Sequence, residues 1–179
     1  FNPCGFLEPA VVTASDAQSV TMVTTTLDGF QLTRTVALEK GKPTVRILNR
    51  LTNPSDKART AQLRSNLMLE MGSLASTRAG FVNRGGQTSA PDIGAVIGRL
   101  REGMFFTAEQ APEGSWSFTG DKGLRVVQAF NPAEVDFTWL CAYPEALGEL
   151  EVELWAVRRR LGANESVELR QSITVERSE

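Results

Sequence analysis

The sequence contains no histidine among its 179 residues. Histidine is the side chain whose unperturbed pKa lies closest to neutrality, and it is the commonest general base and metal ligand in proteins. Its absence argues against most hydrolytic and metal-dependent chemistry. The only two cysteines, Cys4 and Cys141, lack the paired spacing of a zinc site. We therefore expect neither a metal nor another cofactor.

An excess of one charge and long apolar runs are also missing. The chain has 19 Lys and Arg against 21 Asp and Glu, a net charge of -2, and both signs are spread along it. Because nucleic-acid binding requires a clustered basic surface, we expect no nucleic-acid partner. No apolar run approaches the roughly 20 residues of a membrane helix, so we expect no membrane partner either.

The length and composition are those of one ordinary globular domain. Hydrophobic residues make up 41% of the chain and charged residues 22%. A chain of 179 residues is long enough to bury one core, so we expect a single domain over residues 1–179. The chain begins at Phe1 instead of Met, as expected for a processed product or a piece of a longer protein.

Short runs rich in β-branched and aromatic residues alternate with turn-forming residues. Asp28-Gly29 separates two such runs, and this dipeptide supplies the positive φ that a tight hairpin turn requires. The segment 72–103 contains many glycines, which is typical of irregular binding loops or mobile loops. Strands are expected over 19–27, 30–38, 44–51, 61–71, 124–130, 135–143, 150–157 and 167–175, with shorter ones near 81–82, 104–108 and 116–118. This pattern predicts an all-β fold with two antiparallel sheets packed face to face, a β-sandwich.

The apolar run 138–143 contains Cys141. A free cysteine in such a run behaves as a small hydrophobic residue, so the run predicts a buried thiol. A disulfide between Cys141 and Cys4 is the alternative.

Two stretches resemble a known family. The residues LTRTVALEKGKPTVRILNRLTN (32–53) resemble the early strands of galactose mutarotase-like domains, and VELWAVRRRLGANESVELRQSITVE (152–176) resembles their final hairpin. The resemblance implies the galactose mutarotase-like β-sandwich, or supersandwich, found in or beside carbohydrate-active enzymes. It also implies carbohydrate and a neighbouring catalytic domain as partners. An extracellular or periplasmic location is favoured.

Active mutarotases, by this resemblance, would use histidines to protonate the sugar ring oxygen and a glutamate as general base. The histidines have no counterpart in a chain without histidine. The resemblance therefore implies a non-catalytic accessory domain, or a divergent relative, of a sugar-active enzyme.

Three glutamates keep an enzymatic alternative open. Glu149, Glu151 and Glu153 are spaced by two, so they share one face of a strand about 7 Å apart. A carboxylate pair can hydrolyse glycosides without histidine. The first alternative is therefore a carboxylate-dependent glycoside hydrolase or epimerase with Glu153 as a catalytic residue and Glu151 or Asp136 as its partner. The resembling strand of mutarotases carries its catalytic glutamate near Glu153. The competing interpretation is a solvated face of an edge strand.

Aromatic and polar side chains supply candidate ligand-binding residues. Trp155 and Trp116 offer flat faces for stacking on a sugar ring, as Trp139 and Tyr143 also would, and packing in the core is the alternative for each. Arg64 and Asn66 could bind hydroxyl groups. Trp155 shares a face with Glu151 and Glu153. We therefore expect a carbohydrate-binding module; a purely structural or assembly domain is the second alternative.

Overall fold

The computed structural model describes residues 9–99 and 103–177. Within these ranges the chain forms fifteen strands and three short 3-10 helices, so the predicted all-β fold is confirmed. The strands are β1 (Val11–Ser15), β2 (Ser19–Thr25), β3 (Gln31–Leu38), β4 (Thr44–Thr52), β5 (Arg59–Ala61), β6 (Arg64–Glu70), β7 (Arg78–Val82), β8 (Thr88–Ser89), β9 (Met104–Thr107), β10 (Ser115–Thr119), β11 (Leu124–Phe130), β12 (Val135–Ala142), β13 (Glu149–Ala156), β14 (Arg159–Leu161) and β15 (Ser166–Arg177). The helices are η1 (Leu74–Ser76), η2 (Ile93–Val96) and η4 (Ala108–Gln110).

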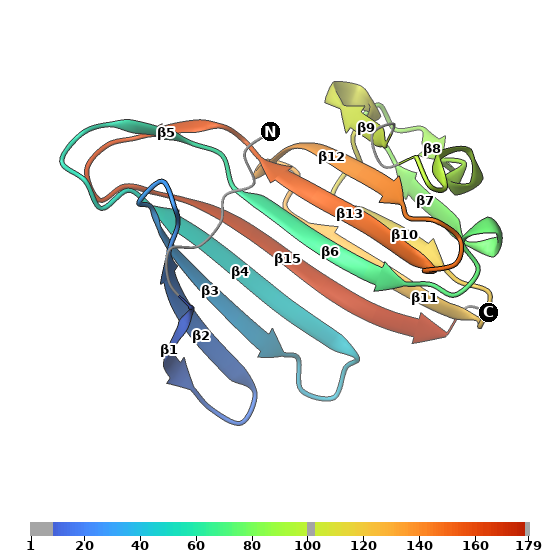
Figure 1. The fold of residues 1–179 in the computed structure, drawn as a ribbon, viewed down its shortest axis with the longest axis horizontal. Helices are drawn as coiled ribbons and strands as arrows, with labels where there is room; N and C mark the ends of the chain where they lie inside the picture. Colours follow the sequence, from blue (N-terminus) through green and yellow to red (C-terminus); the bar gives the residue numbers. More distant parts are fainter. Residues whose placement is uncertain (1–8, 100–102, 178–179) are drawn as a thin grey trace.

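The larger sheet has nine strands in the order β1-β2-β3-β4-β15-β11-β10-β7-β8. Strands β1 to β4 form an up-and-down meander, in which Asp28-Gly29 makes the β2–β3 turn with Gly29 at a φ of 77°. The C-terminal strand β15 pairs with β4 along one edge and with β11 along the other. It therefore joins the meander to β11, β10, β7 and β8 in one antiparallel sheet (Figure 1).

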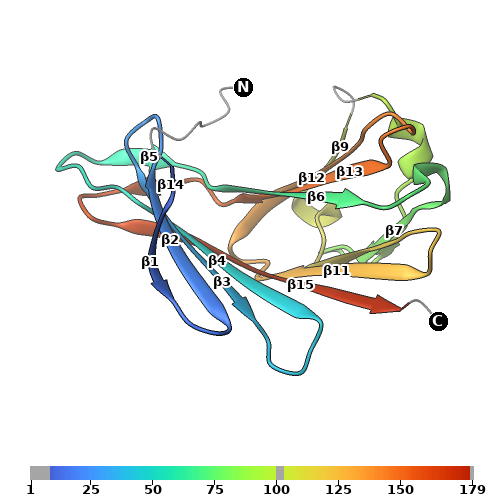
Figure 2. The same ribbon diagram turned by 60° about the horizontal axis from the view of Figure 1, so that its bottom comes forward.

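The smaller sheet has four antiparallel strands in the order β6-β13-β12-β9. It lies over β11, β10 and β7, whereas β2, β3 and β4 extend out from beneath it (Figure 2). Strands β5 and β14 form a separate two-stranded sheet. The molecule is thus a two-layer sandwich whose larger layer is only partly covered by the smaller one.

Alternation along the strands places the core between the two sheets. In β13, Leu150, Val152 and Leu154 point inward and are fully buried. Trp116 and Phe118 of β10 project from the opposite layer into the same core, with ring centroids 5.2 Å apart. Burial of such side chains is the main term that stabilises this fold.

A chain of polar side chains crosses this core. The indole Nε1 of Trp116 donates to Gln128 Oε1 at 2.5 Å, and Gln128 Nε2 donates to Gln171 Oε1 at 2.5 Å. Gln171 Nε2 in turn donates to Ser65 Oγ on the smaller sheet. Because these four side chains bond to one another in sequence, they link the two layers in a fixed register.

Four local expectations are corrected, refined or confirmed. The predicted strand 61–71 is divided between β5 and β6, and the glycine-rich segment contains β7, β8, η1 and η2. Strand β13 lies inside its sheet, between β6 and β12, so its glutamates are not on an edge strand. Cys141 is a buried free thiol, and Cys4 lies outside the described residues.

No helix in residues 9–99 and 103–177 combines the length and apolar character needed to cross a membrane.

Candidate functional site

The outer face of the smaller sheet gathers most of the polar and aromatic residues predicted to act in binding. In its register, Trp155 lies opposite Arg64, and Glu153 lies opposite Asn66 on one side and Trp139 on the other. Directly opposite residues of antiparallel strands share a face. We call this surface the polar-aromatic face; its residues are Arg64, Asn66, Phe105, Phe137, Trp139, Tyr143, Glu151, Glu153 and Trp155.

Glu153 is the central group of the polar-aromatic face. Its side chain is only 2% exposed, and both of its oxygens accept hydrogen bonds. Arg64 Nη1 donates to Oε1 at 2.9 Å, and Trp155 Nε1 donates to Oε2 at 2.7 Å. Burial raises the pKa of Glu153, although the bond from Trp155 and the charge of Arg64 oppose this shift. Glu153 therefore holds the side chains of Arg64 and Trp155 in place.

Glu151 also accepts a side-chain hydrogen bond on each of its oxygens, but it lies closer to the surface than Glu153. Asn66 Nδ2 donates to Glu151 Oε1, and the Tyr143 hydroxyl donates to Oε2 at 3.2 Å. Burial, followed by the charge of Glu151, raises the pKa of Tyr143, so this hydroxyl stays a donor at neutral pH. A carboxylate has about four acceptor positions, and two are used here. The half-buried Glu151 thus retains acceptor capacity for a ligand hydroxyl.

Glu151 and Glu153 are two residues apart on the same face of β13. After burial, the nearby charge of Glu151 also raises the pKa of Glu153. Glycosidase carboxyl groups stand about 5 to 9.5 Å apart, on either side of the bond that is cleaved. Glu153 is covered and both of its oxygens have partners, so it is not placed to act on one side of such a bond. In the described part of the chain, no three Cys, Asp or Glu side chains form a group that could hold a metal ion.

Aromatic rings form the other half of the polar-aromatic face. The Phe137 and Trp155 rings are stacked, with centroids 5.1 Å apart. Phe105 is 60% exposed, and its centroid lies 6.1 Å from those of both Phe137 and Trp139. The rings therefore form a continuous apolar platform beside the glutamates, the amide and the guanidinium.

Gly103 packs directly against one ring of this platform. A Cβ atom at Gly103 would lie 2.3 Å from Trp139 Nε1 and 2.5 Å from Cε2. Only glycine fits there unless the indole moves. The backbone at Gly103 therefore fixes the position of Trp139.

Sequence comparison finds no relative: no family model and no curated protein matches the chain. Comparison of structures, by contrast, finds proteins with the same fold. A putative aldose 1-epimerase from Escherichia coli K12 matches with a TM-score of 0.70 and 11% identity, over 96% of this chain and 69% of that chain. A galactose mutarotase-like protein from Lactobacillus casei matches with a TM-score of 0.70 and 11% identity, over 94% and 73%.

The fold is galactose mutarotase-like. This confirms the resemblance seen in residues 32–53 and 152–176. A GH36 α-galactosidase from Geobacillus stearothermophilus also contains it, with a TM-score of 0.60 and 8% identity over 98% of this chain and 27% of that enzyme. The chain thus spans about 70% of the first two proteins and about a quarter of the third.

Within this mutarotase-like fold, the sequence-predicted residues separate into two groups. Glu151, Glu153, Trp155, Arg64 and Asn66 come together on the polar-aromatic face. Trp116 does not: it is 1% exposed in the core. A surface ligand cannot stack on a ring in that position, so the expected binding role of Trp116 is replaced by a packing role.

Phe105 and Phe137 were not predicted from the sequence as binding residues. The alternation in 135–143 places Phe137 on the same face as Trp139, so the sequence could have identified Phe137 as a candidate binding residue. Phe105 lies in the four-residue strand β9 at the end of the glycine-rich segment. A strand this short has no pattern that distinguishes its exposed ring from the inward-pointing ring of Phe106.

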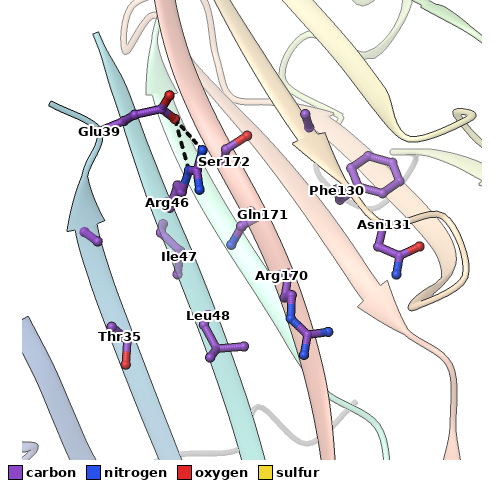
Figure 3. A pocket seen from close by; sticks show the side chains of 12 residues that line it. Thr35, Glu39, Arg46, Ile47, Leu48, Phe130, Asn131, Arg170, Gln171 and Ser172 are labelled. Carbon is purple, nitrogen blue, oxygen red and sulfur yellow. Dashed lines mark hydrogen bonds and ion pairs between the residues drawn. The ribbon is translucent and has the colours of Figure 1, made fainter. Parts of the chain in front are cut away.

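The mutarotase-like sandwich also has an open groove of about 500 Å³ on its larger sheet, lined by residues of β3, β4, β11 and β15 (Figure 3). Arg46 in this groove pairs with Glu39 at 2.8 Å, and Arg170 pairs with Glu134 and Glu168. Its one aromatic ring, Phe130, is 8% exposed. Because this ring is buried, the groove lacks the exposed aromatic surface that Phe105 gives to the polar-aromatic face.

Proposed function

We propose that this chain is a non-catalytic carbohydrate-binding module, and that its polar-aromatic face binds the sugar. One observation carries the proposal: an aromatic platform that includes the exposed ring of Phe105 lies on the same face as a carboxylate, an amide and a guanidinium that are held in position. Sugar rings have apolar faces that stack on aromatic rings and hydroxyl groups that bond to planar polar side chains. The fold's occurrence within an α-galactosidase is consistent with this role.

The proposed role excludes turnover by this chain alone. Glu153 is covered, and both of its oxygens have partners, so it acts by orienting Arg64 and Trp155. Only Glu151 retains acceptor capacity at the surface, whereas a glycosidase needs two carboxyl groups, one on either side of the bond.

Titration of the purified chain with neutral hexoses and their oligosaccharides, followed by calorimetry, tests the proposal. We expect Phe105→Ala to weaken binding about fivefold, or about 1 kcal/mol, because it removes an exposed ring from the platform. Leu124→Ala is the matched control, since Leu124 is 47% exposed on β11 of the other sheet, and it should leave affinity unchanged.

Two results would contradict the proposed function. The absence of binding to a broad glycan panel would favour a structural or assembly domain. Sugar turnover that Glu153→Gln abolishes would favour the carboxylate-dependent enzyme.

A further inference from the structure

The inner face of the larger sheet contains a second polar site that is independent of the polar-aromatic face. Cross-strand register arranges β3, β4 and β15 in rows on this face. From the covered end outward, the rows are Leu32-Leu51-Val167, Arg34-Asn49-Leu169, Val36-Ile47-Gln171 and Leu38-Val45-Ile173. The first row is buried, whereas Leu38 in the last row is 59% exposed. Arg34 and Asn49 therefore lie between the buried end and the exposed end of these strands.

Arg34 is a half-buried cation without a counter-charge. Its Nε donates to Asn49 Oδ1 at 2.7 Å. No carboxylate within residues 9–99 and 103–177 forms an ion pair with it, and burial lowers its pKa. By contrast, Arg46, Arg50 and Arg170 of the same sheet all pair with glutamates. A partly desolvated charge without a partner is costly, so Arg34 favours binding of an anion.

Asn49 adds an independent observation. It is fully buried, and within the described part of the chain its Nδ2 has no hydrogen-bond partner. Buried amide donors are rarely left unpaired in proteins. Its Oδ1 is already used by Arg34, so the amide and the guanidinium together present donors without an acceptor.

The surroundings of these donors are apolar. Met22 lies opposite Arg34 on β2, and Val36 and Ile47 form the next row outward. All three are half-buried, and none offers a group that could bind a hydroxyl. A polar saccharide would leave most of its hydroxyl groups unpaired here, whereas an apolar body would cover these side chains.

We propose that the Arg34–Asn49 site binds a carboxylate carried on an apolar body, such as an aryl-alkyl or alkyl carboxylic acid. The guanidinium can donate through its two Nη atoms in a bidentate pair, and Asn49 Nδ2 supplies a further donor. The apolar body lies over Met22, Val36 and Ile47. No covalent step is involved.

The probe that tests this site is 3-phenylpropionate, compared with its neutral isostere 3-phenylpropanamide and with D-glucuronate. Binding is followed by the NMR signal of the Arg34 Nε–H group, which reports on this side chain alone. We expect a saturable shift with 3-phenylpropionate and at least tenfold weaker binding of the amide and of glucuronate. Equal binding of the amide would overturn the anion site, and equal binding of glucuronate would overturn the apolar body.

Two variants provide an independent test by calorimetry. Arg34→Met keeps the apolar stem and removes the charge, so binding of 3-phenylpropionate should be lost. Asn49→Asp places a carboxylate beside Arg34 and should also abolish binding, because the chain then supplies its own anion. Arg50→Met, on the opposite face, is the matched control and should bind as the unmodified protein does.

Circular dichroism establishes that each variant is folded, and retention of sugar binding at the polar-aromatic face separates this proposal from the proposed function. Unchanged binding of 3-phenylpropionate by folded Arg34→Met or Asn49→Asp would refute the site.

Discussion

Replacing Arg64 by methionine tests whether a covered carboxylate organises the polar-aromatic face. The change removes the donor at 2.9 Å from Glu153 and leaves that side chain 2% exposed without its cation. Removing one partner of a buried ion pair costs about 3 to 5 kcal/mol. The Arg64 side chain is 30% exposed, and Trp155 still donates to Glu153, so we expect a loss of about 2 to 3 kcal/mol at pH 7. For a chain of this size, this lowers Tm by about 5 to 10 °C.

The pH dependence of this loss distinguishes the charge from simple packing. The pKa of Glu153 is raised in the folded protein, mainly by burial, so the folded state binds this proton more tightly than the unfolded chain does. The stability that protonation of Glu153 contributes is fully present below the unfolded pKa of about 4.3. It is lost as pH rises through the folded pKa. Without Arg64 the folded pKa rises further. The stability difference between the two proteins should therefore be small near pH 4.5 and grow toward pH 7.

Urea unfolding at both pH values, followed by far-UV circular dichroism, measures this difference. In a Glu153→Gln background, Arg64→Met should cost about 1 kcal/mol or less, because no buried charge remains to be uncovered. Arg50→Met removes an exposed pair with Glu168 and should change stability by less than about 1 kcal/mol at either pH. A loss for Arg64→Met that is equal at both pH values and unchanged by Glu153→Gln would refute the reasoning.

Two further predictions concern Gly103, which packs on Trp139, and Cys141 of β12. Gly103→Ala places a methyl group 2.3 Å from the indole of Trp139. We therefore expect a shifted tryptophan emission and a loss of about 1 to 2 kcal/mol in stability. The control is Gly80→Ala, whose new methyl group would have its nearest neighbour 3.8 Å away, and it should show neither effect. Burial raises the pKa of Cys141 to about 11, from 9.0, so its thiolate fraction at pH 8 falls about a hundredfold. Alkylation of Cys141 at pH 8, read by peptide mass spectrometry, should be at least that much slower in the folded protein than in guanidinium, and equal rates would contradict the burial.

Local alternation allows a sequence to reveal the face of a strand but not the neighbours of that strand. The pattern in 150–157 correctly places Glu151, Glu153 and Trp155 on one face. It contains no information on whether that strand is at an edge, because pairing with β6 and β12 joins segments far apart in the chain. The burial of Glu153 follows from those two neighbours and from the rings across the face, and therefore required the structure.

Large aromatic residues show the same limit. Trp116 and Trp155 have the same chemistry and both lie on alternating strands, so composition assigns them equal binding potential. Trp116 faces the opposite sheet and donates to Gln128, whereas Trp155 faces outward and donates to Glu153. Which face of a strand is covered depends on how the layers stack, and period-two alternation describes only the difference between the two faces.

The two proposed sites follow opposite electrostatic arrangements, and this difference predicts how each behaves without ligand. On the polar-aromatic face, Glu153 and Glu151 accept the donors of Arg64, Trp155, Asn66 and Tyr143, so these side chains are held in place before any sugar arrives. At the second site, Arg34 has no carboxylate partner and Asn49 Nδ2 has no acceptor within the described residues, so that site is completed only by an anion. Added 3-phenylpropionate should therefore raise Tm by binding at Arg34 while leaving sugar affinity unchanged. The polar-aromatic face is the outer face of the smaller sheet, whereas the Arg34–Asn49 site is on the inner face of the larger sheet, so the two sites share no residue and neither needs the other to be occupied.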